Sequence, residues 1–97
     1  MEVSGGMDEV IRKRICFYGG VQGVGFRWRA KCAANAVNAT GWVRNEYDGS
    51  VTMEIQGTEA QIDLVILVIE RGSYVRIENL ESRSLPVVPG EKGFHAR

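Results

Sequence analysis

Residues 11–35 read IRKRICFYGGVQGVGFRWRAKCAAN, and three local patterns follow one another within them. The first part, residues 11–18, is rich in β-branched and aromatic residues, and one of its two alternating faces is apolar except for Lys13. Four glycines then fall within seven residues. Residues 26–35 contain several alanines and neither glycine nor proline, which is typical of a helix. The stretch therefore predicts a strand, a glycine-rich loop and a helix.

The next part of the chain predicts a β-hairpin and a second helix. Two strand-like runs, residues 41–46 and 50–56, flank Tyr47-Asp48-Gly49, and an Asp-Gly between such runs is a strong hairpin signal. Thr58 and Gln61 have the spacing of a capping box, and apolar residues then repeat at helical spacing as far as Gly72.

The last third of the chain predicts one further strand and a short edge strand. Residues 75–85 are strand-like, Pro86 and Pro89 interrupt the pattern, and residues 94–97 are expected to add a short strand at the edge. The order is βαββαβ with a β-tail. We therefore predict an α+β fold of the ferredoxin-like type, in which an antiparallel sheet carries both helices on one face.

Length and composition predict a single small domain. The chain has 97 residues, of which 44% are hydrophobic and 25% charged, as in ordinary globular domains. Residues 1–9 are expected to form a flexible tail and residues 10–97 one domain. No stretch is long and apolar enough to span a membrane. The two cysteines are too few for a zinc site or a disulfide framework, so we expect reduced thiols and a cytoplasmic location.

Basic and acidic residues are equal in number, but they are unevenly distributed along the chain. Twelve basic and twelve acidic residues give a net charge of zero, so nothing favours nucleic acid or an anionic membrane as a partner. Residues 10–45, however, contain basic residues and no acid. Two interpretations stay open: this half meets a small anion, or it pairs with the acidic second half.

The glycine-rich loop carries the main chemical signal. Gly19, Gly20, Gly23 and Gly25 lie between a strand and a helix, where backbone amides can approach a ligand closely and form a cradle for phosphate. The loop is not a nucleotide-binding P-loop, because Phe and Arg follow Gly25 where Lys and Ser or Thr are required. Trp28 occupies the third glycine position of a dinucleotide-binding motif, which excludes that class too.

Two side chains near this loop are candidates for function. Arg27 would lie in the first helical turn, where a guanidinium can bind phosphate oxygens through two hydrogen bonds. Asn45 precedes the hairpin turn. Spacing alone favours a role for its amide in holding the turn, and a functional role needs further support.

That support comes from a resemblance. The segments Gly19-Gly-Val-Gln-Gly-Val-Gly-Phe-Arg27 and Gly41-Trp-Val-Arg-Asn45, with Asp48-Gly-Ser-Val51 after them, resemble the two signatures of the acylphosphatase family. The resemblance covers nearly the whole chain after the tail. Two departures are a glycine at position 20, where the family has a basic or bulkier residue, and Ala96 in place of a larger apolar residue in the last strand.

The resemblance implies a hydrolase that cleaves acyl phosphates to a carboxylate and inorganic phosphate without metal or cofactor. It implies that Arg27 and the loop hold the phosphoryl group and that Asn45 positions the attacking water. The loop residues so implied are Gly20, Val21, Gln22, Gly23, Val24, Gly25 and Phe26. The expected partners are the small-molecule substrate and inorganic phosphate as product or inhibitor, bound by a monomer without nucleic acid or membrane.

Other functions also fit parts of the sequence. A ferredoxin-like sheet with a basic half also describes an RNA-recognition module, but no strand carries the aromatic motif of that class. A further alternative is a non-catalytic anion-binding domain. Another is a segment of a larger carbamoyl-transferring protein, which the length of the chain and the absence of zinc-finger cysteines oppose.

The remaining chemically active side chains are expected to be structural. His95 has no partner at ligand spacing and is expected to be a solvated edge-strand residue. Trp28 and Trp42 are expected in the core. Cys16 and Cys32 are expected to be small buried residues whose elements pack closely enough to permit a cross-link under oxidation.

Overall fold

Seven elements follow one another in residues 9–97, the part of the chain that the computed structural model describes. They are β1 (Ile11–Gly20), α2 (Phe26–Ala36), β2 (Thr40–Asn45), β3 (Val51–Gly57), α3 (Glu59–Glu70), β4 (Arg76–Leu85) and β5 (Phe94–Ala96). The order matches the predicted βαββαβ arrangement with its short final strand. The predicted tail, apart from its last residue, lies outside the described residues.

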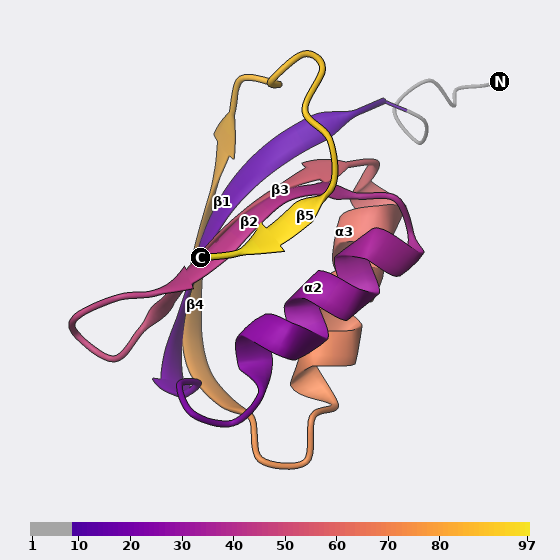
Figure 1. Ribbon diagram of the computed structural model, residues 1–97. Helices are drawn as coiled ribbons and strands as arrows, with labels where there is room; N and C mark the ends of the chain where they lie inside the picture. Colours follow the sequence, from indigo (N-terminus) through magenta and orange to yellow (C-terminus); the bar gives the residue numbers. More distant parts are fainter. Residues whose placement is uncertain (1–8) are drawn as a thin grey trace, which may run out of the picture.

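The strands form one sheet in the order β4-β1-β3-β2-β5. The first four strands of that order pair antiparallel, and β5 pairs parallel with β2. The sheet is therefore mixed. After β4, a long connection carries the chain to the β2 side of the sheet, where β5 forms the edge strand and pairs parallel with β2. Both helices cover the same face of the sheet (Figure 1), which confirms the ferredoxin-like prediction.

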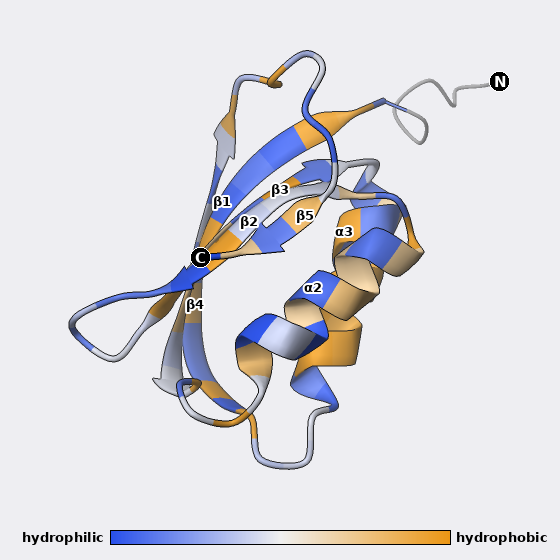
Figure 2. Ribbon diagram, in the orientation of Figure 1, coloured by the Kyte–Doolittle hydropathy of each residue, from blue (hydrophilic) through white to orange (hydrophobic). Residues whose placement is uncertain are grey.

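The core lies between the helices and the sheet. Alternation along β1 directs Ile15 and Phe17 toward the helices, and the colouring by hydropathy shows α3 to be hydrophobic along most of its length (Figure 2). Lys13, on the same face, is half-buried. The core cluster comprises Ile15, Phe17, Val21, Phe26, Ala30, Ala34, Ala39, Val43, Val51, Met53, Ile55, Ile62, Val65, Ile69 and Phe94.

The capping box at the start of α3 forms as predicted. The backbone amide of Gln61 donates to Thr58 Oγ1 at 3.2 Å, and the Thr58 amide donates to Gln61 Oε1 at 2.7 Å. Two of the amides that an isolated helix leaves without partners are thereby satisfied. Among residues 9–97, neither helix is long and apolar enough to cross a membrane.

The face of the sheet opposite the helices carries a buried ion-pair network. Arg12 is 3% exposed, and its guanidinium donates to Glu91 at 2.7 Å and to Glu54 at 3.0 Å. The Gln56 side chain exchanges two hydrogen bonds with the backbone of Val88. These contacts hold the connection between β4 and β5 against β1 and β3.

The two tryptophans differ from each other. Trp42 is 9% exposed, but it lies on the open face of the sheet, where the guanidinium carbons of Arg44 and Arg97 lie 5.0 and 4.6 Å from its ring centroid. Trp28 is 69% exposed on α2. The prediction of a core position was therefore wrong for Trp28, since the buried residues of α2 are Phe26, Ala30 and Ala34.

The cysteines and the histidine complete the comparison with the predictions. Cys32 is exposed on α2, contrary to prediction, and Cys16 is half-buried on the open face beside Thr52. Both are free, and the sheet separates their side chains, so this fold does not permit the cross-link. His95 is exposed on β5, as predicted.

Candidate active site

Buried side chains anchor both ends of the glycine-rich loop. Val21 and Phe26 are 0% and 2% exposed, and the Phe26 ring packs edge-on against Phe17 with 4.9 Å between the centroids. Between these anchors, Gly23 and Gly25 are exposed and have φ angles of +73° and +79°. A Cβ would meet nothing within 4 Å at either glycine, so it is backbone conformation rather than space that requires glycine there.

The loop leads directly into an uncapped helix start. Gly25 is the N-cap of α2 and provides no side-chain hydrogen bond, and the first turn contains no acidic residue. The start of α3, in contrast, has its full capping box and Glu59. The open amides and the positive end of the helix dipole make the start of α2 suited to an anion.

One predicted cradle amide is already engaged. The amide of Val21 donates to the carbonyl oxygen of Gly19 at 3.0 Å. In the described part of the chain, the amides of residues 22–26 have no such backbone partner. The amides of the loop that have no backbone partner therefore begin after Val21.

A small cavity of about 180 Å³ opens at this loop. It is lined by Val21, Gly23, Gly25, Phe26, Arg27, Trp28 and Asn45. The fold thus brings Arg27, from the first turn of α2, and Asn45, from the end of β2, to the cavity that the glycines border. Gly20, Gln22 and Val24 are not part of the lining: Gly20 ends β1, and Val24 packs partly against the core.

The Gln22 side chain joins the loop to the hairpin that carries Asn45. Its Nε2 donates to the carbonyl oxygens of Glu46 at 2.7 Å and Ser50 at 2.9 Å, the two residues that flank the turn. Gln22 therefore points toward the hairpin rather than into the cavity, which the sequence pattern did not indicate.

The last residue of the chain contacts Arg27. Arg27 Nη1 donates to the backbone oxygen of Arg97 at 2.7 Å. Arg97 is held in turn by its own amide, which donates to Val43 at 2.8 Å, and by its guanidinium over Trp42. Sequence reasoning missed this contact, because 70 residues separate the partners and the acceptor belongs to the backbone, which leaves no trace in residue type.

The hairpin turn is held by residues other than Asn45. Both the amide and the hydroxyl of Ser50 donate to Asp48 Oδ1, and these hydrogen bonds lower the pKa of Asp48. In the described structure, the Asn45 side chain makes no hydrogen bond and is exposed beside the cavity. The turn-holding role that spacing favoured is therefore filled by Asp48.

The internal pairing of the basic first half is confirmed for part of it, and binding of a small anion stays a prediction. Arg12, Arg14 and Arg44 pair with Glu54, Glu91 or Glu46, which is internal pairing. Arg27 forms no such ion pair among the described residues. The cavity lining contains Arg27 and neither Asp nor Glu. Residues 9–97 include no group of three or more His, Cys, Asp or Glu side chains placed to hold a metal ion.

Comparison with known proteins gives a consistent result. A family model described as Acylphosphatase matches residues 13–96. The acylphosphatase of Clostridium beijerinckii is 35% identical over 86 residues, which are 88% of this chain and 96% of that protein. The crystal structure of acylphosphatase from Bacillus subtilis is similar to this structure, with a TM-score of 0.81 and 26% sequence identity. The matched region is 90% of this chain and 98% of that chain.

The similarity extends to a much longer protein. The crystal structure of full-length HypF in a phosphate- and nucleotide-bound form matches with a TM-score of 0.78 and 26% identity. The matched region is 97% of this chain but only 12% of the HypF chain. The family model spans the glycine-rich loop, Arg27 and Asn45, and the relative from Clostridium is matched over nearly its full length. This chain belongs to the acylphosphatase family.

Proposed function

We propose that this protein hydrolyses acyl phosphates, with Arg27 and the loop amides holding the phosphoryl group and Asn45 orienting the attacking water. The observation that carries the assignment of roles is the cavity at which Arg27, Asn45 and the glycines at positions 23 and 25 meet. Family membership supports the reaction, since the relatives matched over most of this chain are acylphosphatases.

The reaction needs little more than positioning and charge stabilisation. Water attacks phosphorus in line, the bond from phosphorus to the acyl oxygen breaks, and its electron pair leaves on the carboxylate. Because a carboxylate is a good leaving group, no general acid is required. The proton of the water passes to a phosphoryl oxygen of the substrate, which agrees with a lining that contains no acidic side chain.

Arg27 stabilises the negative charge on the transferring phosphoryl group. Its guanidinium has one Nη donating to Arg97, which fixes its orientation and leaves other N–H groups for the phosphoryl oxygens. The open amides of the loop and of the first turn of α2 supply further donors without any reorganisation. Arg27 is therefore expected to contribute more than any single amide.

The proposal extends to the setting of the reaction. The protein acts on a small molecule as a monomer, uses no metal or cofactor, and works in the cytoplasm. The internal pairing of Arg12 and Arg14 on the open face of the sheet argues against an RNA-binding surface there.

The proposal is tested by hydrolysis of a chromogenic aroyl phosphate with EDTA present. Arg27→Ala is expected to lower kcat/KM by about 10³- to 10⁵-fold, as for an arginine on a transferring phosphoryl group. Asn45→Ala is expected to lower kcat by about 10²- to 10³-fold, as for the loss of one transition-state donor.

Matched controls separate these roles from general effects on the fold. Lys31→Ala removes a positive charge from the same helix outside the cavity lining and is expected to keep full activity. Circular dichroism and urea unfolding show whether each variant is folded. A folded wild type without turnover, or a folded Arg27→Ala protein with full turnover, would contradict the proposal.

A further inference from the structure

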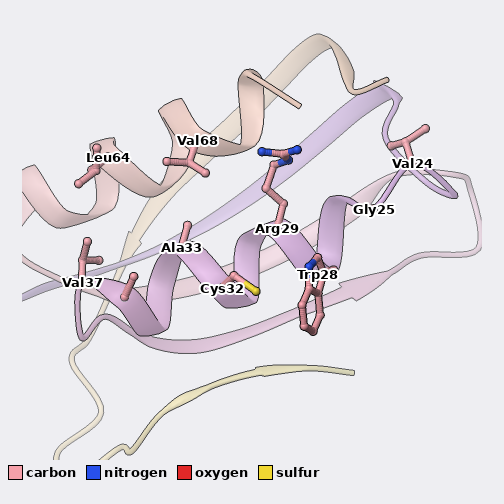
Figure 3. A pocket seen from close by; sticks show the side chains of 10 residues that line it. Val24, Gly25, Trp28, Arg29, Cys32, Ala33, Val37, Leu64 and Val68 are labelled. Carbon is pink, nitrogen blue, oxygen red and sulfur yellow. The ribbon is translucent and has the colours of Figure 1, made fainter. Parts of the chain in front are cut away.

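An apolar groove of about 540 Å³ runs along the outer side of the two helices. Trp28, Cys32 and Ala33 of α2 and Leu64 and Val68 of α3 line it (Figure 3). Trp28 is 69% exposed and Leu64 46% exposed. Large apolar side chains gathered on a surface in this way mark binding sites more often than isolated ones do.

The groove is continuous with the candidate active site. Gly25 and Trp28 line both the groove and the phosphate cavity, whereas Asn45 lines the cavity alone. Trp28 lies near the start of α2, the end of the helix at which Gly25 is the N-cap (Figure 3). The groove therefore begins at the phosphate cavity, on a part of its wall that Asn45 does not form.

We propose that this groove binds the acyl group of the substrate, and that the preferred substrates are acyl phosphates with a long apolar acyl chain. This proposal rests on the proposed function. An in-line reaction requires the leaving carboxylate to depart on the side of phosphorus opposite the water. With water held at Asn45, the acyl chain leaves past Gly25 and Trp28 and enters the groove.

The lining favours an apolar chain over a charged one. Arg29 is the one charged residue of the lining in the described structure. Its side chain points toward α3 (Figure 3) and packs at the end of that helix, since a Cβ on Gly72 would lie 2.8 Å from Arg29 Nε. Between Trp28 and Leu64 the groove presents aromatic, thiol and aliphatic groups, which gain from contact with methylenes.

The test compares acetyl phosphate with octanoyl phosphate, followed through the release of inorganic phosphate. Wild type is expected to have the higher kcat/KM for octanoyl phosphate. Trp28→Ala and Leu64→Glu are each expected to reduce this preference by about tenfold, because one methylene in an apolar pocket is worth about 10- to 200-fold. Leu64 lines the groove and not the cavity, so its substitution is expected to lower the hydrolysis of octanoyl phosphate more than that of acetyl phosphate.

Leu67→Glu is the matched control. Leu67 lies one turn from Leu64 on α3, is 42% exposed and is not part of the groove lining, so its substitution is expected to leave the chain-length preference intact. Competitive inhibition by octylphosphonate and methylphosphonate, which are not hydrolysed, gives the same comparison for binding alone. Wild type is expected to bind octylphosphonate more tightly and Leu64→Glu to lose that difference.

The outcomes separate the two proposals. Wild-type turnover of acetyl phosphate without a preference for the longer chain, or a preference that Trp28→Ala and Leu64→Glu both retain, overturns the groove assignment and leaves the proposed function in place. Loss of the preference in Leu67→Glu also overturns it, because the effect is then not specific to the groove. If wild type neither turns over acetyl phosphate nor binds either phosphonate, both proposals fail.

Discussion

Gly19 and Gly20 are neighbours in β1 but differ in whether their backbone conformation and surroundings require glycine. Gly19 has a φ of +125°, at a register shift between β1 and β4, and a Cβ there would overlap the carbonyl oxygen of Arg76. At Gly20, φ lies outside the left-handed region, and a Cβ would meet the Arg76 Cβ at 3.6 Å, an ordinary contact. Only the first position requires glycine.

Alanine substitutions test this difference. Gly19→Ala is expected to lower the free energy of unfolding by about 1–3 kcal/mol, the usual cost of a strained backbone conformation. Gly20→Ala is expected to raise it by about 0.4–1 kcal/mol, because it restricts the unfolded chain without straining the folded one. Urea unfolding measures the free energy of unfolding of both variants. If Gly19→Ala were as stable as Gly20→Ala, the neighbouring backbone would have moved to make room for the new Cβ, and glycine would not be required at position 19.

At the scale of elements, the site depends on how the loop after β1 meets the β2–β3 hairpin. The two hydrogen bonds from Gln22 Nε2 to Glu46 and Ser50 are the direct polar link between them. We therefore expect Gln22 to act as a positioning residue that sets Asn45 relative to the loop. A misplacement of about 1 Å can cost about 10²-fold in rate.

The prediction for Gln22→Met, which keeps the volume and removes the donor, is a fall in kcat of about 10- to 100-fold with little change in KM. Gln61→Met is the control, since Gln61 also donates to a backbone carbonyl, that of Val37, but away from the cavity; it is expected to lower stability and not kcat. In an Asn45→Ala background the effect of Gln22→Met should largely vanish. Full additivity would exclude a route through Asn45.

At the scale of the whole molecule, Arg12 joins distant parts of the chain. It lies in β1 and binds Glu54 of β3 and Glu91 of the β4–β5 connection. Burial raises the pKa of Glu91, but hydrogen bonds from Arg12 and Thr40 outweigh burial and leave the pKa below its ordinary value of 4.5. A carboxyl whose pKa is lower in the folded state stabilises the fold above its ordinary pKa, and loses that contribution as pH falls through the folded pKa.

Glu91→Gln is accordingly expected to lower the free energy of unfolding at pH 7 by about 1.5–3 kcal/mol, the usual contribution of a hydrogen bond to a charged group. The difference from wild type should shrink as pH falls from 4.5 through the lower pKa of the folded state, because the wild-type carboxyl becomes neutral over that range, as the glutamine amide is at every pH. Urea unfolding at several pH values measures this, with the exposed Glu70→Gln as control. A difference independent of pH would assign the effect to shape rather than charge.

Local patterns in the sequence were sufficient to predict the elements and their order. The glycines before Phe26, the Asp-Gly turn and the Thr58–Gln61 capping box act over a few residues, so residue type alone reveals them. Arg27 was a candidate from its position directly after the glycine-rich loop. Asn45 became a candidate only through the resemblance to the family's signatures, because its spacing alone favoured a structural role.

Only the tertiary structure decided how these parts face one another. It exposes Trp28 and buries Trp42, because other residues of α2 are buried against the sheet while two arginines cover the open face. It also places the backbone oxygen of Arg97 on Arg27 and the Gln22 amide on the hairpin. Each of these contacts joins a side-chain donor to a backbone oxygen far away in the chain. Every residue has a backbone oxygen, so residue type does not distinguish the one that is used.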